Sequence, residues 1–103
     1  MQLLEISKEK VKITGPLSAR KVIQSFVPEY PAWARAKNVE ADVAIRFTVS
    51  SGGEVRETMT IARTSGYPEL DRLAVEALKK WKFSALPGGQ DQWGEITFRF
   101  LLN

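Results

Sequence analysis

The feature that most constrains this chain is an alternation of apolar and polar side chains over residues 41–62. Apolar residues recur on one face of two adjacent segments, first at Val43, Ile45, Phe47 and Val49 and then at Val55, Met59 and Ile61. Between the segments lies Ser50-Ser51-Gly52-Gly53, a sequence suited to a turn. Because successive side chains of a strand point to opposite faces, the pattern predicts an antiparallel hairpin with one buried face.

An amphipathic helix is predicted directly after this hairpin. Apolar side chains recur there with helical spacing, at Leu70, Leu73, Ala74, Ala77, Leu78 and Trp81. Pro68 suits the first turn of a helix, because the N–H groups of that turn have no partner within the helix and proline lacks an N–H. Glu69 and Asp71 then lie at the positive end of the helix dipole. We therefore interpret Asp71 as a structural acid rather than as a general acid or base.

Two further elements complete the predicted domain. A short helix starts at Pro31 and ends at Asn38, and a last strand carries Ile96, Phe98, Phe100 and Leu102 on one face. The predicted fold class is α+β, a three-stranded antiparallel sheet with two helices packed on one face, in the order helix, strand, strand, helix, strand. We assign residues 1–27 to an N-terminal arm or linker end and residues 28–103 to the domain.

The arm carries the weakest pattern in the chain. Lys10–Ile13 alternates, which indicates an edge strand, and Gly15-Pro16 interrupts it. The spacing of Ala19, Val22, Ile23 and Phe26 indicates a short helix that starts at Pro16. The arm therefore adds a strand or a short helix to the predicted domain.

The composition argues against catalysis and against a metal site. The chain has no cysteine and no histidine, so it lacks thiolate ligands, the commonest general base and the commonest metal ligand. We therefore expect no enzymatic activity, no metal and no cofactor. The net charge of +3 is spread along the chain without a polybasic block, and we expect no nucleic-acid partner. Trp33 and Trp93 are the aromatic residues whose burial the pattern leaves open.

An ordered set of short motifs lies between Pro28 and Leu102. They are Tyr30-Pro31 and Ala34, the alternating segment Val43–Val49, Gly53-Glu54-Val55, Ser65-Gly66, Leu70-Asp71, Ala74 and Ala77, and Trp81-Lys82-Phe83. In this order they resemble the C-terminal domain of TonB-type energy transducers. The chain departs from that family's pattern at Ala41, where a glycine is usual, at Ala85, where a proline is common, and at Val27, where some members have glutamine.

The resemblance implies a periplasmic domain, tethered by a linker to an inner-membrane helix that works with the ExbB–ExbD motor. Such a domain catalyses no reaction. It grips the TonB box, a short extended segment of an outer-membrane transporter, by strand addition to a sheet edge. We expect that edge to be the last strand, which nothing follows along the chain: Glu95, Ile96, Thr97, Phe98, Arg99, Phe100 and Leu101. The resemblance also implies partner contacts at Val27, Tyr30 and Arg35.

Other interpretations stay open at this point. Pairing of the open strand with a second copy would give a homodimer. A TolA-like periplasmic domain with another peptide partner would share the same shape. An RNA-binding α+β domain is a third alternative, although Phe98 and Phe100 share the parity of the buried positions.

Overall fold

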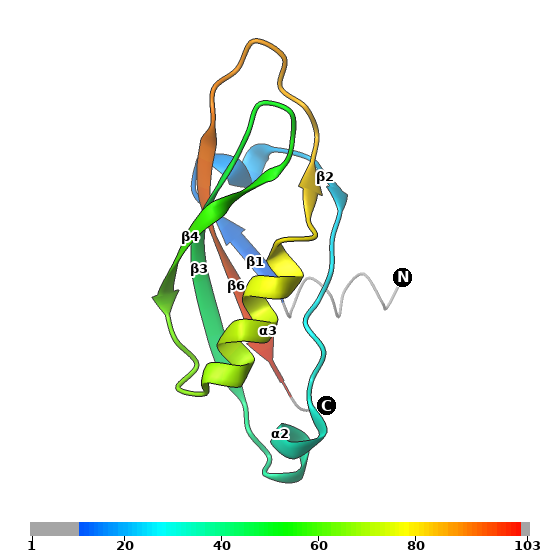
Figure 1. Cartoon of the computed structure of the whole chain (residues 1–103), viewed down its shortest axis with the longest axis vertical. Helices are drawn as coiled ribbons and strands as arrows, with labels where there is room; N and C mark the ends of the chain where they lie inside the picture. Colours follow the sequence, from blue (N-terminus) through cyan, green and yellow to red (C-terminus); the bar gives the residue numbers. More distant parts are fainter. Residues whose placement is uncertain (1–10, 102–103) are drawn as a thin grey trace.

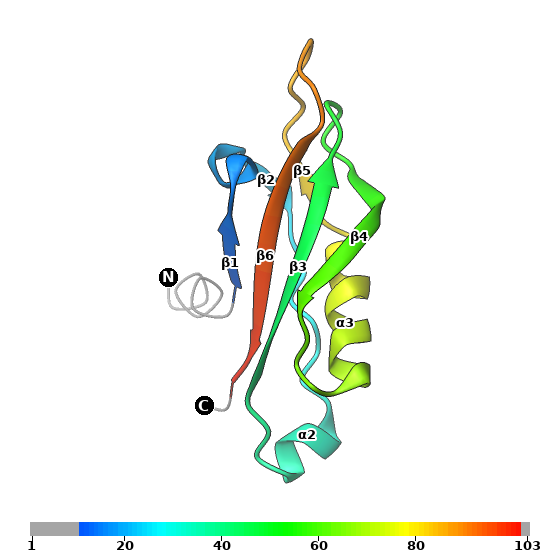
Figure 2. The same cartoon turned by 90° about the vertical axis from the view of Figure 1, so that its left-hand side faces the viewer.

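The computed structural model describes residues 11–101 and contains a four-stranded antiparallel sheet with helices on one face (Figure 1). Figure 2 shows the strands in the order β1 (Val11–Thr14), β6 (Gln92–Phe100), β3 (Ala41–Val49) and β4 (Val55–Arg63). The remaining elements are a 3₁₀-helix, η1 (Pro16–Ala19), a second sheet of β2 (Val22–Gln24) and β5 (Lys82–Phe83), and the helices α2 (Ala32–Ala36) and α3 (Pro68–Leu78). The predicted α+β class is confirmed.

The central pair of strands is β3 and β6, which are in register along their full length, from Ala41 opposite Phe100 to Val49 opposite Gln92. On the inner face, Val43 lies opposite Phe98 and Ile45 opposite Ile96, and all four side chains are buried. The predicted pairing of β3 and β4 as a hairpin is also confirmed, with two register shifts. Its buried face is confirmed for β3 only, because in β4 Val55 and Met59 are partly buried and Ile61 is 41% exposed.

The turn of this hairpin requires its glycine at position 53. Gly53 has φ 98° and donates its N–H to the carbonyl oxygen of Ser50. A Cβ atom at this position would lie 2.0 Å from the carbonyl oxygen of Phe83. A side chain would therefore meet both an unfavourable backbone conformation and a backbone atom.

Helix α3 starts at Pro68 as predicted, but it ends at Leu78 rather than at Trp81. The amides of Lys80 and Trp81 then bond to the carbonyl oxygens three residues earlier, which tightens the last turn. Trp81 still faces the core, at 5% exposure, with its ring 6.0 Å from that of Phe83 and 6.2 Å from that of Phe98.

Helix α2 is shorter than predicted. Pro31 directly precedes the first residue of the helix. The carbonyl oxygen of Pro31 accepts hydrogen bonds from the amides of Ala34 and Arg35. Ala34 is fully buried. Asn38, with φ 56°, lies just beyond the helix, as its predicted role at the helix end requires.

The arm differs from the sequence-based interpretation in one respect. The strand is confirmed as β1, but the helix expected after Pro16 is wrong beyond η1, because Val22–Gln24 is extended and pairs with β5. Ile23 and Phe26 are exposed, so their helical spacing did not reflect a buried stripe. Within residues 11–27, β1 pairs with β6, β2 pairs with β5 and Leu17 is buried. The domain boundary at residue 28 stays a prediction. Lys10 and Leu102 lie outside the described residues.

The expected open edge at the last strand is also wrong for this structure. β1 pairs with Glu95–Phe98, so β6 is an inner strand with β3 on its other side. Among residues 11–101, the edges of the sheet are β1 and β4.

Asp71 ties the start of α3 to the loop before it. Partial burial alone would raise the pKa of Asp71, but hydrogen bonds from the hydroxyl of Thr64 and from the amide and hydroxyl of Ser65 together outweigh it. The pKa of Asp71 is therefore below its ordinary value. This arrangement supports the structural interpretation of the acid.

We expect Trp81→Ala to lower the free energy of unfolding by about 3–5 kcal/mol, because it removes a large side chain from the core. Trp93→Ala is the matched control, since Trp93 is 46% exposed; it should cost about 1 kcal/mol or less. Urea denaturation of both variants measures the difference. Equal losses would contradict the assignment of Trp81 as the core tryptophan.

We expect Asp71→Asn to destabilise the chain at pH 7 by about 1 kcal/mol, below the roughly 1.5–3 kcal/mol of hydrogen bonds to a charged group, because solvent screens a carboxylate that is only partly buried. Because folding lowers the pKa of Asp71, its stabilisation is complete above the unfolded-state pKa of about 3.9 and is lost as the pH falls through the folded-state value. Urea denaturation from pH 7 to pH 3 should show parent and variant converging. A gap that stays constant over this range would contradict the assignment.

Candidate functional site

The strand β6 presents two different faces. Ile96, Phe98 and Phe100 point inward and are buried, with Phe98 at 1% and Phe100 at 3% exposure. Neither phenylalanine can therefore stack on a base, which removes the feature that suggested RNA binding. Glu95, Thr97 and Arg99 lie on the opposite face of the sheet.

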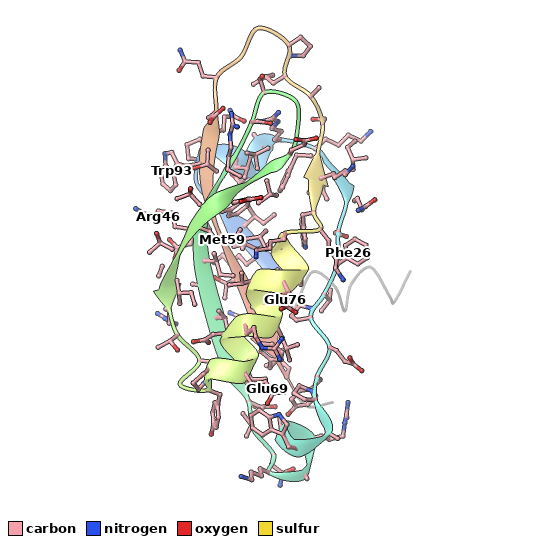
Figure 3. The ribbon with its side chains drawn as sticks, viewed as in Figure 1. Phe26, Arg46, Met59, Glu69, Glu76 and Trp93 are labelled. Carbon is pink, nitrogen blue, oxygen red and sulfur yellow. The ribbon has the colours of Figure 1, made fainter. Side chains whose placement is uncertain are left out.

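Trp93 forms a small exposed cluster on that opposite face. Figure 3 shows Trp93 and Arg46 together on the side of the sheet turned away from α3. The Arg46 guanidinium lies 4.9 Å from the centre of the Trp93 ring, and its Nη2 is 3.7 Å from a carboxylate oxygen of Glu95. Trp33, in contrast, packs partly buried against the core. Of the two tryptophans that the pattern left open, only Trp93 is available to a partner.

One edge of β6 is occupied by β1 in antiparallel register. Val11 lies opposite Phe98 and Ile13 opposite Ile96, and both apolar side chains pack on the core. Lys12 and Thr14 are exposed. The alternation at residues 10–13 indicates this strand, but the sequence-based interpretation did not identify β6 as its partner.

Two of the expected partner contacts lie together at the end of β6. The ring of Tyr30 is 6.3 Å from that of Phe100, and its hydroxyl donates to the carbonyl oxygen of Val39. The guanidinium of Arg35 lies over the Tyr30 ring, 5.0 Å from its centre. Tyr30 and Arg35 are therefore placed at the same end of the strand as Arg99–Leu101.

Val27, the third expected contact, lies elsewhere. It is exposed on the extended segment after β2, beside a surface hollow of about 230 Å³ that α3 also lines. This segment is held by the side chain of Gln24, which donates to the carbonyl oxygen of Lys80, and by Trp81 Nε1, which donates to that of Phe26. The structure thus separates Val27 from the pair formed by Tyr30 and Arg35.

Arg20 connects the arm to the hairpin turn, and the sequence-based interpretation did not single it out. Its guanidinium donates to the carbonyl oxygens of Ser84 and Ser50, at 2.8 Å each, and to that of Ser51 at 3.2 Å. Such long-range bonds leave no periodic signal in the sequence.

The second edge of the sheet is β4. Its pairing with β3 shifts register near Ala44 and near Phe47, and such irregularities hinder pairing with another chain. A homodimer through strand pairing stays a prediction. No helix within residues 11–101 is long and apolar enough to cross a membrane.

Comparisons with known proteins place this fold in a family. Residues 27–102 match the family described as the Gram-negative bacterial TonB protein C-terminal domain. The chain is 35% identical over 79 residues to protein tonB2 of Pseudomonas aeruginosa, which is 74% of this chain and 29% of that protein. It is 32% identical over 94 residues to protein TonB of Salmonella typhimurium, 90% of this chain and 37% of that protein.

The fold is also similar to a solved structure, the solution NMR structure of the Pseudomonas aeruginosa TonB C-terminal domain. The TM-score is 0.69 at 22% identity, over 95% of this chain and 92% of that one. The chain spans about a third of the length of the curated relatives that it matches. Because the family match covers most of its residues, this chain belongs to the family of C-terminal domains of Gram-negative bacterial TonB proteins.

Proposed function

We propose that this chain is the partner-gripping domain of a TonB-like energy transducer. It binds the TonB box of an outer-membrane transporter by strand addition at the edge of β6 that faces away from β3. The observation that carries the proposal is the family match over residues 27–102. The proposed contact residues are Glu95–Leu101, with Tyr30 and Arg35 at the far end of the strand.

The architecture supports this mode of binding. β3 holds β6 along its full length on one side. On the other side β1 pairs only with Glu95–Phe98, so a peptide added along that edge would have to take the place of this short strand. A peptide added there would form several hydrogen bonds, each worth about 0.5–1.5 kcal/mol net. A pull along the strand loads these bonds together, and a reversible contact could then carry force for a short time.

Tyr30 and Arg35 suit a role in side-chain recognition. Tyr30 lies beside Phe100, at the end of β6 beyond the four residues that β1 covers, and Arg35 lies over the Tyr30 ring. The cation over the Tyr30 ring is exposed, so a carboxylate of the partner could pair with Arg35 without displacing a buried contact. Val27, on its separate segment, would contact a different part of the transporter or none.

We further propose that the domain works in the periplasm as part of a longer protein. That protein would be anchored in the inner membrane and driven by the ExbB–ExbD motor. The support is the family, together with the curated relatives, which are about three times as long as the region they share with this chain. The proposed role is non-enzymatic, since binding and force transmission need no catalytic group.

The proposal predicts that a peptide from the N-terminal segment of a transporter binds chiefly through its backbone. Only alternate amides of an added strand face its neighbour. We therefore expect N-methylation of one set of alternate peptide amides to lower the affinity at least about tenfold, through the loss of several hydrogen bonds. N-methylation of the other set should have little effect. NMR titration of the labelled chain measures both affinities.

The same titration locates the peptide. Amide shifts should concentrate at residues 95–101 and in β1, with few in β4, and a peptide of shuffled sequence serves as the control. Equal binding by the two N-methylated peptides would contradict strand addition. Binding only by peptides of another periplasmic partner would favour the TolA-like alternative.

A further inference from the structure

We propose that β1 is an internal competitor for the place of the partner on β6. On this proposal, the partner displaces residues 11–14 and inserts apolar side chains at the two inward positions that Val11 and Ile13 now fill. The inference rests on the proposed function. It adds that β1 occupies the binding edge when no partner is bound, and it specifies the side-chain pattern of a segment that can bind there.

β1 is weakly attached compared with the other strands of the sheet. Within the described residues it has four residues, against nine in each of β3, β4 and β6. Val11 and Ile13 are only partly buried, and the main neighbours of β1 are β6 and η1. Figure 2 shows β1 at the margin of the sheet, on the opposite side from α3. Among residues 11–101, β6 therefore provides most of the contacts that hold this strand in place.

The chain after β1 is anchored independently of it. Leu17 in η1 is fully buried. It packs so closely on Gly94 that a Cβ atom there would lie 2.8 Å from Leu17 Cβ. Three residues later, Arg20 is fixed by its bonds to Ser50 and Ser84. Residues 17–20 can therefore stay in place when β1 leaves.

Gly15 provides a hinge between β1 and this anchor. Its φ of 91° is readily adopted only by glycine. The carbonyl oxygen of Gly15 accepts hydrogen bonds from the amide and the hydroxyl of Ser18. These bonds attach the carbonyl group of Gly15 to η1. Rotation on the amide side of Gly15 then moves residues 11–14 without disturbing η1.

The pairing of β1 also defines what the edge accepts. Val11 and Ile13 lie opposite Phe98 and Ile96 on the inner face, whereas Lys12 lies opposite Thr97 on the outer face. An incoming segment that restores the packing must carry apolar residues two positions apart. Its intervening residue faces solvent, so its identity matters less.

A reversible tether tests the proposal. The chain has no cysteine, so Lys12→Cys with Thr97→Cys gives one pair of directly opposed residues, at a spacing that a disulfide can bridge. The probe is a synthetic peptide from the N-terminal segment of an outer-membrane transporter. Oxidation should weaken peptide binding at least about tenfold, because the disulfide holds β1 on β6 and so prevents the state that binds the peptide. Reduction should restore the binding.

The matched control tethers strands that stay paired. Arg46→Cys with Thr60→Cys joins β3 to β4, and oxidation there should leave the peptide affinity unchanged. Far-UV circular dichroism and urea denaturation confirm that each variant is folded. Comparing the oxidised and reduced forms of one variant cancels any effect of the substitutions themselves.

A second variant loosens β1 instead. Ile13→Ser removes half of its apolar packing and should tighten peptide binding by about fivefold or more, since a larger fraction of the chain is then competent. Equal binding by the oxidised and reduced tethered forms, or no gain in Ile13→Ser, would overturn the role of β1 and leave the proposed function standing. No binding in any form, including Ile13→Ser, would overturn the proposed function and this inference with it.

Discussion

The antiparallel ladder between β3 and β6 is the interaction on which the rest of the structure depends. Its register places Val43 opposite Phe98 and Ile45 opposite Ile96, and these side chains form the layer on which the helical side packs. Trp81 reaches that layer from beyond α3 through its contact with Phe98. Because more than forty residues separate the end of β3 from the start of β6, the ladder forms only when two distant parts of the chain meet. The core therefore depends on contacts between residues far apart in the sequence rather than on local contacts.

The two sides of this ladder are held differently. On the β4 side, α3 packs on β3 and closes the core. On the β1 side, a four-residue strand with two partly buried side chains occupies the edge. The proposed gripping and release of a partner would benefit from this asymmetry, since one edge could open while the core stays folded. The fixed contacts of Leu17 and Arg20 confine such an opening to the residues before Gly15.

Local periodicity predicted the elements whose apolar stripe faces the core. β3, α3 and the last strand follow from their spacing alone, and the burial of Phe47, Leu70 and Ile96 explains why. The strand β4 was also predicted, although its stripe is not buried and Ile61 is 41% exposed. The helix expected after Pro16 failed because Ile23 and Phe26 are apolar yet exposed. The open edge at β6 failed for another reason, since strand order depends on long-range pairing that no short window of sequence records. Tyr30 and Arg35 were suggested by the family resemblance, whereas the contacts of Tyr30 with Phe100 and of Arg35 with the Tyr30 ring required the structure.

Native-state hydrogen exchange measures the claimed separation between ladder and edge most directly. We expect the β1 amides that face β6 to exchange through a local opening, at least about a hundredfold faster than the amides that bond β3 to β6, which exchange only on global unfolding. A bound transporter peptide should leave the β3–β6 amides protected while the β1 amides lose their remaining protection. Exchange of the β1 amides at the same rate as the β3–β6 amides, with no change on adding the peptide, would contradict the account.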